Sequence, residues 1–234
     1  VVLHKSDMWT KTTKNMNPEN FEEFKKNEDK HFRVAIFGSS KIEEEDDTYR
    51  RVKHLAAMLG ERGIDVLTGG GPGLMKAANE GHVIGTTISG SNAYSVGIGI
   101  NLPWNQKFNE GVEYRKKLNI FSRRLDEFML LSNAVIIEPG GLGTLLELFY
   151  TWQLVQVHHI CDIPIILIGD EWEGLLRWIK DELLAKEYLK EDDYKLAFYV
   201  KNSNEVLEII DEAYNDFKKG GKNFCLNYEK YKIK

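Results

Sequence analysis

The chain has 234 residues, of which 42% are hydrophobic and 29% are charged, a balance typical of a soluble globular protein that can bury a sizeable core. Its formal net charge of −5 gives no reason to expect attraction to nucleic acid or to a membrane, and no apolar run approaches the roughly 18 residues of a membrane-spanning helix. The two cysteines, Cys161 and Cys225, have no short spacing, so neither a disulfide framework nor a cysteine zinc site is indicated.

The N-terminal region, residues 1–31, is predicted to be an extension of the main domain. It lacks the apolar segment of a signal peptide, which together with the low cysteine content indicates a cytoplasmic protein. Phe21 and Phe24 stand among acids and lysines, which predicts a short amphipathic helix over residues 18–27 that packs on the body or on a second subunit.

The first two predicted strands each end in a glycine-containing turn. Residues 33–37 form an apolar run before Gly38-Ser39-Ser40, and residues 64–67 form another before Gly69-Gly70-Gly71-Pro72-Gly73. A helical pattern over residues 52–59 lies between them, and the acidic residues 43–47 are expected to cap it. Taken alone, the turn at Ser39 is more typical of an ordinary loop, and a ligand contact becomes an equal alternative only because a second glycine-rich turn follows.

A small-residue-rich helical pattern follows the second turn, with Glu80 either facing a substrate or, as we favour, lying on the surface. Residues 83–87 and 96–102 are further apolar runs, and the loop 104–110 has the composition of a lid over a site. Residues 118–131 are predicted to be helical. Arg124 lies on the apolar side of that helix, so it either pairs with a carboxylate or faces an anionic ligand.

The most informative stretch follows the predicted buried strand 134–137. Pro139 and three of the next four residues, Gly140, Gly141 and Gly143, form a turn into a helix that continues to about residue 157. Glu147 is the only Asp, Glu, Lys or Arg between Glu138 and Asp162. A lone carboxylate on an apolar helix has either a functional role or a favourable place in the helix dipole, and both remain open on periodicity alone.

Both glycine turns, near Gly69 and near Gly140, expose backbone N–H groups at the start of a helix and can therefore hold a phosphate. The run that begins at Gly69 does not match GxxxxGK[ST], nor GxGxxG followed by an acid at the end of the next strand. Further along the chain, an apolar run at 163–168, a helical pattern at 173–184, a short strand at 198–200 and a helix at 204–217 continue the strand and helix alternation. The sequence therefore predicts one α/β domain over residues 32–217, a doubly wound, Rossmann-like parallel sheet flanked by helices, with a C-terminal tail at 218–234.

Two motifs together resemble the LOG family: PGGxGTxxE at residues 139–147 and Gly-Gly-Gly-Pro-Gly-Leu-Met at residues 69–75. Members of that family are nucleoside 5′-monophosphate phosphoribohydrolases, known for releasing cytokinin bases and often labelled "possible lysine decarboxylase". The resemblance covers roughly residues 33–185 and implies a hydrolase that converts AMP or a cytokinin-type riboside monophosphate to free base and ribose 5-phosphate.

The resemblance also implies roles for individual residues. Glu147 is expected to act beside the ribose and Arg124 to be the essential arginine. The phosphate is expected to contact the turn residues Ser39, Gly70, Gly71, Gly140, Gly141, Gly143 and Thr144. The chain departs from the family at Leu125, where lysine is usual, and at Leu146, where an acid is usual. The first departure leaves a second basic contact in doubt.

No metal or other cofactor is required by this scheme, and the family resemblance implies a homodimer acting on a small nucleotide. The alternative hypothesis is a non-catalytic carrier of a nucleotide or of the molybdenum cofactor, because such carriers share the superfamily fold. Amino-acid decarboxylation is disfavoured, because a pyridoxal enzyme needs a Schiff-base lysine and Lys76 is the only lysine we place near either glycine turn. The base that is released is not identified by the sequence.

Overall fold

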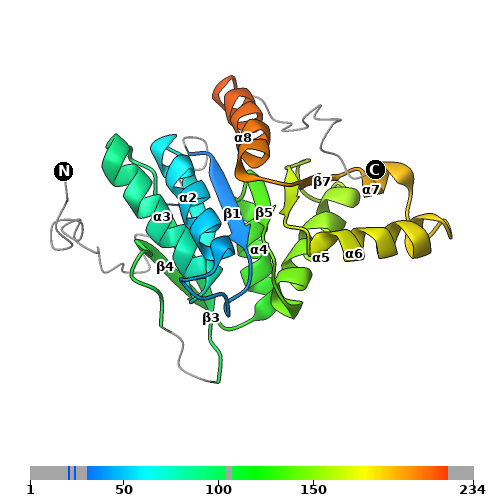
Figure 1. The fold of residues 1–234 in the computed structure, drawn as a ribbon, viewed down its shortest axis with the longest axis horizontal. Coiled ribbons are helices and arrows are strands. Elements are labelled where there is room, and N and C mark those ends of the chain that lie inside the picture. Colours follow the sequence, from blue (N-terminus) through cyan, green and yellow to red (C-terminus); the bar gives the residue numbers. More distant parts are fainter. Residues whose placement is uncertain (1–20, 22–23, 25–30, 104–106, 221–234) are drawn as a thin grey trace.

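The computed structural model describes residues 21, 24, 31–103 and 107–220, and the structural statements below refer to these residues. Strands and helices alternate along the described chain, except that the third and fourth strands follow one another with no helix described between them (Figure 1). The strands are β1 (Arg33–Phe37), β2 (Asp65–Thr68), β3 (Ser95–Ile100), β4 (Tyr114–Leu118), β5 (Ala134–Ile137), β6 (Ile165–Ile168) and β7 (Ala197–Val200). The helices are α2 (Asp47–Glu61), α3 (Leu74–Ser89), α4 (Phe121–Leu131), α5 (Leu142–Gln156), α6 (Trp172–Trp178) with its π-helical continuation η2 (Ile179–Leu184), α7 (Glu191–Tyr194) and α8 (Ser203–Lys218).

These strands form one parallel sheet in the order β4-β3-β2-β1-β5-β6-β7. The chain winds outward from β1 to β4 and then returns to β5, which pairs with β1 in a register that places Phe37 beside Ile137. The direction of winding therefore reverses between β1 and β5. In open parallel sheets, ligands bind beyond the carboxyl ends of the strands at such a reversal. The predicted doubly wound, Rossmann-like α/β fold is confirmed.

The apolar runs that predicted the central strands are buried along their whole length. Every residue of β1, β2, β5 and β6 is buried, as expected for strands covered by helices on both faces. Helix α2 begins after Asp46, whose carboxylate accepts a hydrogen bond from the Thr48 N–H at 2.7 Å. The acidic stretch before this helix therefore caps it, as predicted.

The small residues of α3 allow that helix to lie directly against α2 (Figure 1). A Cβ atom added at Gly81 would lie 1.9 Å from the Lys53 carbonyl oxygen, and one added at Gly85 would lie 1.9 Å from that of Ala57. The two backbones are thus in contact over two turns of helix. The apolar run at residues 83–87 belongs to α3 and is not a separate element.

Strand β4 was not predicted, because its sequence Tyr-Arg-Lys-Lys-Leu carries three consecutive cations. It lies at the edge of the sheet, where charged side chains on an exposed strand prevent pairing with another chain. As a result, helix α4 begins at Phe121 and not at residue 118, which ends β4.

Phe21 and Phe24 are buried in the main core, and Phe24 packs against the rings of Tyr94 and Tyr114. The rest of the predicted helix at 18–27, residues 104–106 of the predicted lid and residues 221–234 of the tail lie outside the described residues. No helix in the described ranges has both the length and the apolar character needed to cross a membrane.

Candidate active site

The turns that follow β1, β2 and β5 are tied together at the carboxyl edge of the sheet. The Ser39 N–H donates to the Pro139 carbonyl oxygen at 3.0 Å, which joins the turn after β1 to the turn after β5. The Leu74 N–H donates to the Ser39 carbonyl oxygen at 2.9 Å, which joins the start of α3 to the same place. Gly73 makes this possible, because its φ is +67° and a Cβ there would lie 2.5 Å from the Ser39 carbonyl oxygen.

A cavity of about 600 Å³ opens above these turns. It is lined by Gly38, Ser39, Ser40, Lys41, Gly69, Gly70, Gly71, Met75, Gly99, Ile100, Leu102, Lys107, Phe108, Lys117, Phe121, Arg124, Gly141, Leu142, Gly143, Thr144 and Glu147. The lining includes all but one of the residues that the sequence analysis assigned to a site. The exception is Gly140, where an added Cβ would lie 2.1 Å from the Thr144 hydroxyl oxygen, so this glycine makes room for Thr144 in the cavity wall.

The N-terminus of α5 faces this cavity through Leu142, Gly143 and Thr144. No side chain among the described residues caps this helix, and its first turn contains no acid. The first N–H groups of a helix have no partner within the helix and carry the positive end of its dipole. This end of the cavity can therefore hold a phosphate or another anion.

Arg124 and Glu147 meet in the cavity wall, although they come from different helices, α4 and α5. Nη1 of Arg124 lies 2.9 Å from Oε1 of Glu147, and the side chains are only 11% and 10% exposed. Nε of Arg124 donates to the Ile98 carbonyl oxygen at 2.9 Å, and the guanidinium lies 5.1 Å from the Phe128 ring centre. Of the two alternatives for Arg124, pairing with a carboxylate is therefore confirmed, and contact with an anionic ligand stays a prediction, although the side chain also lines the cavity.

The glycine turn after β2 gives Arg124 its place. A Cβ added at Gly69 would lie 2.6 Å from Nη2 of Arg124. The guanidinium therefore lies directly against the backbone of the turn at Gly69. Its partner Glu147 is on α5, which follows the turn at Gly140, so the ion pair is close to both glycine turns.

Burial raises the pKa of Glu147 above its ordinary value, and the attraction of Arg124 opposes this rise. A carboxylate in such a place can accept a proton from water more readily than an exposed one, and its negative charge is little screened by solvent. The pair can therefore stabilise positive charge that develops on a ligand bound over it.

Three lysines in the cavity wall, Lys41, Lys107 and Lys117, were missed by sequence reasoning. The statement that Lys76 is the only lysine near the glycine turns is wrong. Lys76 itself does not line the cavity and pairs with Glu44 at 2.5 Å. Nothing local in the sequence indicated Lys117, because it belongs to the strand that was not predicted. Glu80 also lies outside the lining and pairs with Lys53 at 2.7 Å.

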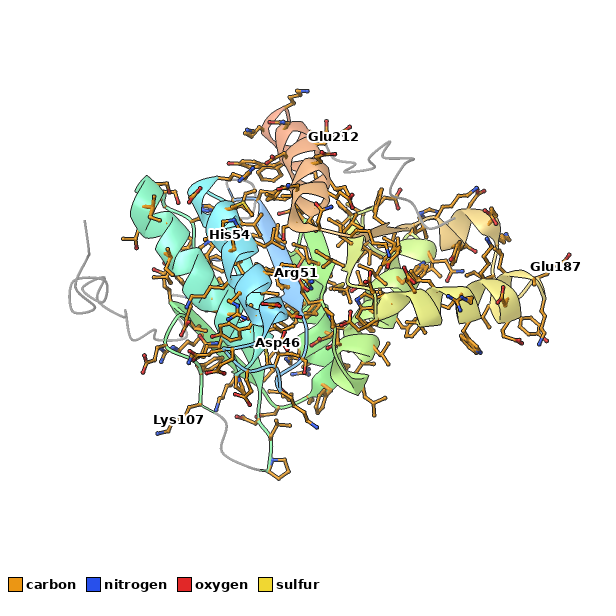
Figure 2. All side chains as sticks on the ribbon, viewed as in Figure 1. Asp46, Arg51, His54, Lys107, Glu187 and Glu212 are labelled. Atoms are coloured by element: carbon orange, nitrogen blue, oxygen red, sulfur yellow. The ribbon has the colours of Figure 1, made fainter. Side chains whose placement is uncertain are left out.

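Glu138, directly before the proline of the main motif, was also overlooked. Its side chain is fully buried, and Oε2 lies 2.5 Å from Nη2 of Arg51, which projects from α2 (labelled in Figure 2). Burial raises the pKa of Glu138 to about 7, Arg51 opposes the rise, and the charge of Glu171 adds to it. No signal in the sequence separates this glutamate from an exposed one at the end of a strand.

We expect Glu138 to make the protein less stable as the pH rises from about 4.5 to about 7. In this range the folded protein retains a proton that the unfolded chain releases, so the free energy of unfolding falls with pH. A pKa raised from 4.5 to about 7 corresponds to a loss of about 3 kcal/mol at 1.36 kcal/mol per pKa unit. Urea unfolding of the wild type and of Glu138→Gln, measured between pH 4.5 and 8, isolates this contribution, because all other titrating groups are shared. The two curves of stability against pH should diverge, and parallel curves would contradict the assignment.

Comparison with known proteins places residues 75–210 within the model of a family described as "possible lysine decarboxylase". Over 152 residues the chain is 29% identical to a protein of Oryza sativa subsp. japonica named as a probable cytokinin riboside 5′-monophosphate phosphoribohydrolase, covering 63% of this chain and 58% of that protein. Over 162 residues it is 29% identical to a pyrimidine/purine nucleotide 5′-monophosphate nucleosidase of Escherichia coli K12, covering 65% of this chain and 34% of that protein. The chain thus matches less than two thirds of the length of either relative.

Among solved structures, the molybdenum cofactor binding protein of Rippkaea orientalis superposes on the chain with a TM-score of 0.54 and 20% sequence identity. The match covers 77% of this chain and 96% of that protein. At this level of identity the likeness concerns the fold, the parallel sheet with its flanking helices.

Proposed function

From the premise that this chain belongs to the family described as "possible lysine decarboxylase", we propose that it hydrolyses the N-glycosidic bond of nucleoside 5′-monophosphates to a free base and ribose 5-phosphate. The observation that carries the proposal is the buried pair of Arg124 and Glu147, which lines the same cavity as both glycine turns. An anion-binding helix N-terminus and a buried carboxylate in one cavity fit a ligand that has a phosphate at one end and a reacting sugar beside it.

In this proposal the phosphate lies at the N-terminus of α5, where it accepts hydrogen bonds from backbone N–H groups and from the Thr144 hydroxyl. Ser39, Gly70 and Gly71 complete this part of the pocket. The ribose then lies over Glu147. Among the described residues, the lining contains no acid other than Glu147 that would repel the phosphate.

The bond between the anomeric carbon and the base breaks as the ribose develops positive charge, and the Glu147 carboxylate stabilises that charge. Water attacks the anomeric carbon and gives up a proton to Glu147, while the base departs with the bonding electron pair and takes up a proton from solvent. Glu147 then returns its proton to solvent. Arg124 holds the Glu147 carboxylate in place, and its attraction opposes the rise in pKa that burial causes.

The names of the two sequence relatives agree with this proposal. The rice protein is named for cytokinin riboside 5′-monophosphates, and the E. coli protein for pyrimidine and purine nucleotides. Both names describe cleavage of nucleoside 5′-monophosphates, and this shared reaction is what we carry over to the present chain.

The test is to incubate the purified protein with a panel of nucleoside 5′-monophosphates, including AMP and a cytokinin riboside monophosphate, and to follow free base and ribose 5-phosphate by chromatography. We expect stoichiometric formation of both products from at least one nucleotide. A folded sample that releases no base from any of them would refute the proposal. Tight nucleotide binding without turnover would favour a carrier instead.

We further propose that the protein acts as a homodimer in which α5 faces its copy. Four apolar side chains of this helix region are exposed in the single chain, Leu142 by 86%, Leu146 by 46%, Phe149 by 41% and Val157 by 56%. Because Leu142, Leu146 and Phe149 are spaced by four and three residues, they form one apolar stripe along the helix. Such a stripe is stabilised by a second apolar surface, and a second copy supplies the same stripe.

Light scattering coupled to size-exclusion chromatography should give the mass of a dimer for the wild type. Replacing both Leu146 and Phe149 with glutamate should shift it to the mass of a monomer, since charges would then lie in the interface. Tyr188→Glu is a matched control, because Tyr188 is 78% exposed and lies outside α5. A wild type that runs as a monomer, or a double variant that remains dimeric, would contradict this interface.

A further inference from the structure

The charge of the cavity is unlike the charge of the whole chain. Its lining holds four cations, Lys41, Lys107, Lys117 and Arg124, against one acid, Glu147, whereas the chain carries a net charge of −5. Arg124 is paired with Glu147, so the excess of positive charge comes from the lysines. A single phosphate at the start of α5 accounts for a cation nearby, but it does not account for three lysines in the lining.

The strand order separates two of these lysines. Lys41 follows β1, beside the turn after β5, and so lies at the end of the cavity where we place the phosphate. Lys117 is on β4, three strands away from β1 in the sheet. Neighbouring strands are about 4.8 Å apart, so β1 and β4 are separated by about 14 Å across the sheet. Lys107 extends at the rim of the molecule (Figure 2). Lys117 is thus the cation at the opposite end from the phosphate.

Phe108 forms an apolar wall at that opposite end. Its ring rests on three glycines, because an added Cβ would lie 2.3 Å from the ring at Gly70 and 3.0 Å from it at Gly97 and Gly99. Any larger residue at these positions would push the ring out. Phe108 is therefore held in a slot made by the backbone of β3 and of the turn after β2.

Lys117 is held beside this wall. Its Cγ would lie 3.5 Å from a Cβ at Gly99, and its Nζ lies 5.7 Å from the Phe108 ring centre. Further apolar lining is contributed by Ile100, Leu102 and Phe121. The end of the cavity over β3 and β4 thus combines apolar and aromatic walls, suited to a flat ring, with the hydrogen-bond donors of a lysine ammonium.

We propose that Lys117 is a specificity-determining residue, and that it favours nucleoside 5′-monophosphates whose base carries a carbonyl group, a 6-oxopurine above all, over those with a 6-aminopurine. This inference rests on the proposed function for the orientation of the ligand, with the phosphate at α5 and the base over β3 and β4.

The chemical reason is the match of donors and acceptors. A lysine ammonium has three N–H donors and no acceptor, so it can bind a ligand while it keeps contacts within the protein. A 6-oxopurine offers the carbonyl oxygen O6 and the ring nitrogen N7 as adjacent acceptors, the pair that lysine and arginine recognise in guanine. A 6-aminopurine places an N–H donor at the same position, where it would face the ammonium.

The experiment compares IMP and AMP, which differ at position 6. Their dissociation constants are measured by calorimetry with Glu147→Gln as the parent, because turnover by this variant is expected to be much slower than that of the wild type. We expect IMP to bind this parent about tenfold or more tightly than AMP, the discrimination typical of such a contact. Adding Lys117→Met should bring the two affinities within about threefold, chiefly by weakening IMP, whereas Lys117→Arg should retain the preference.

Lys41→Met is the matched control, because it removes a lysine at the phosphate end of the same cavity. It should weaken IMP and AMP by the same factor. Equal affinity of the parent for the two nucleotides, no binding of either, or a preference that survives Lys117→Met would each overturn the inference.

Wild-type turnover of IMP and AMP is measured in parallel, which separates this inference from the proposed function. Selective binding of IMP without release of base by the wild type would sustain the role of Lys117 and refute the hydrolase. Release of base from both nucleotides at equal kcat/KM, with equal affinities, would sustain the hydrolase and refute the role of Lys117.

Discussion

Glu147→Gln is expected to lower kcat for base release by about 10²-fold to 10⁴-fold, the range typical for loss of a positioned general base. The amide has the shape of the carboxylate and can still accept the hydrogen bond from Nη1 of Arg124. It carries no charge to stabilise the ribose and cannot accept a proton from water. Nucleotide binding should remain, because the phosphate is held by the glycine turns and by α5, which the substitution does not touch.

Glu80→Gln is the matched control for this experiment. Glu80 is also a half-buried glutamate in an ion pair, with Lys53 at 2.7 Å, but it does not line the cavity. It should retain nearly full activity. A Glu147→Gln enzyme that releases base at the wild-type rate, from a sample that binds nucleotide normally, would remove Glu147 from the mechanism.

The pH dependence of the wild-type rate gives a second measure of Glu147. Because a general base acts in its deprotonated form, activity should be lost on the acid side of its pKa. Burial raises this pKa, so the loss should occur at higher pH than for an exposed glutamate. This acid limb should be absent from the residual activity of Glu147→Gln.

Arg124→Met is expected to reduce the free energy of unfolding by about 3–5 kcal/mol at neutral pH, the cost typical of removing one partner from a buried ion pair. The Glu147 carboxylate would then be buried without its counter-ion, since its side chain is only 10% exposed to solvent. The destabilisation should diminish at lower pH, because a carboxyl whose pKa is raised in the folded state takes up a proton there and loses its charge. Urea unfolding at several pH values measures both effects.

The control is the double variant with methionine at both positions. Replacing a whole buried ion pair with apolar side chains is often neutral or stabilising, so the double variant should recover most of the stability that Arg124→Met loses. A double variant as unstable as the single one would show that the loss comes from the packing of Arg124 on Phe128 and the Ile98 carbonyl, and not from the unpaired charge.

The elements that the sequence predicted correctly are central strands, which are buried on both faces, and helices that have one clear apolar face. The run 134–137 became β5 with the predicted bounds, and the acids before α2 cap that helix. Strand β4 was missed because an edge strand is exposed on one side, and its alternation is hidden by consecutive cations. The resemblance to the LOG family is confirmed by the family match and by the rice relative. The roles of single residues stay predictions until the variants are measured.

The glycine-rich turns and one apolar helix can be recognised in the sequence alone. They were enough to locate the turns that can hold a phosphate and to single out Glu147 and Arg124 as candidates. That Arg124 reaches Glu147, 23 positions later, depends on Gly69 leaving room for its guanidinium, and that contact arises when β2, α4 and α5 come together. The place of Lys117 follows from the winding reversal, which puts β4 at one edge of the sheet and its lysine at the far end of the cavity. Local patterns report which face of an element is buried, whereas the neighbours of a side chain across the sheet are set by strand order, which no short stretch of sequence contains.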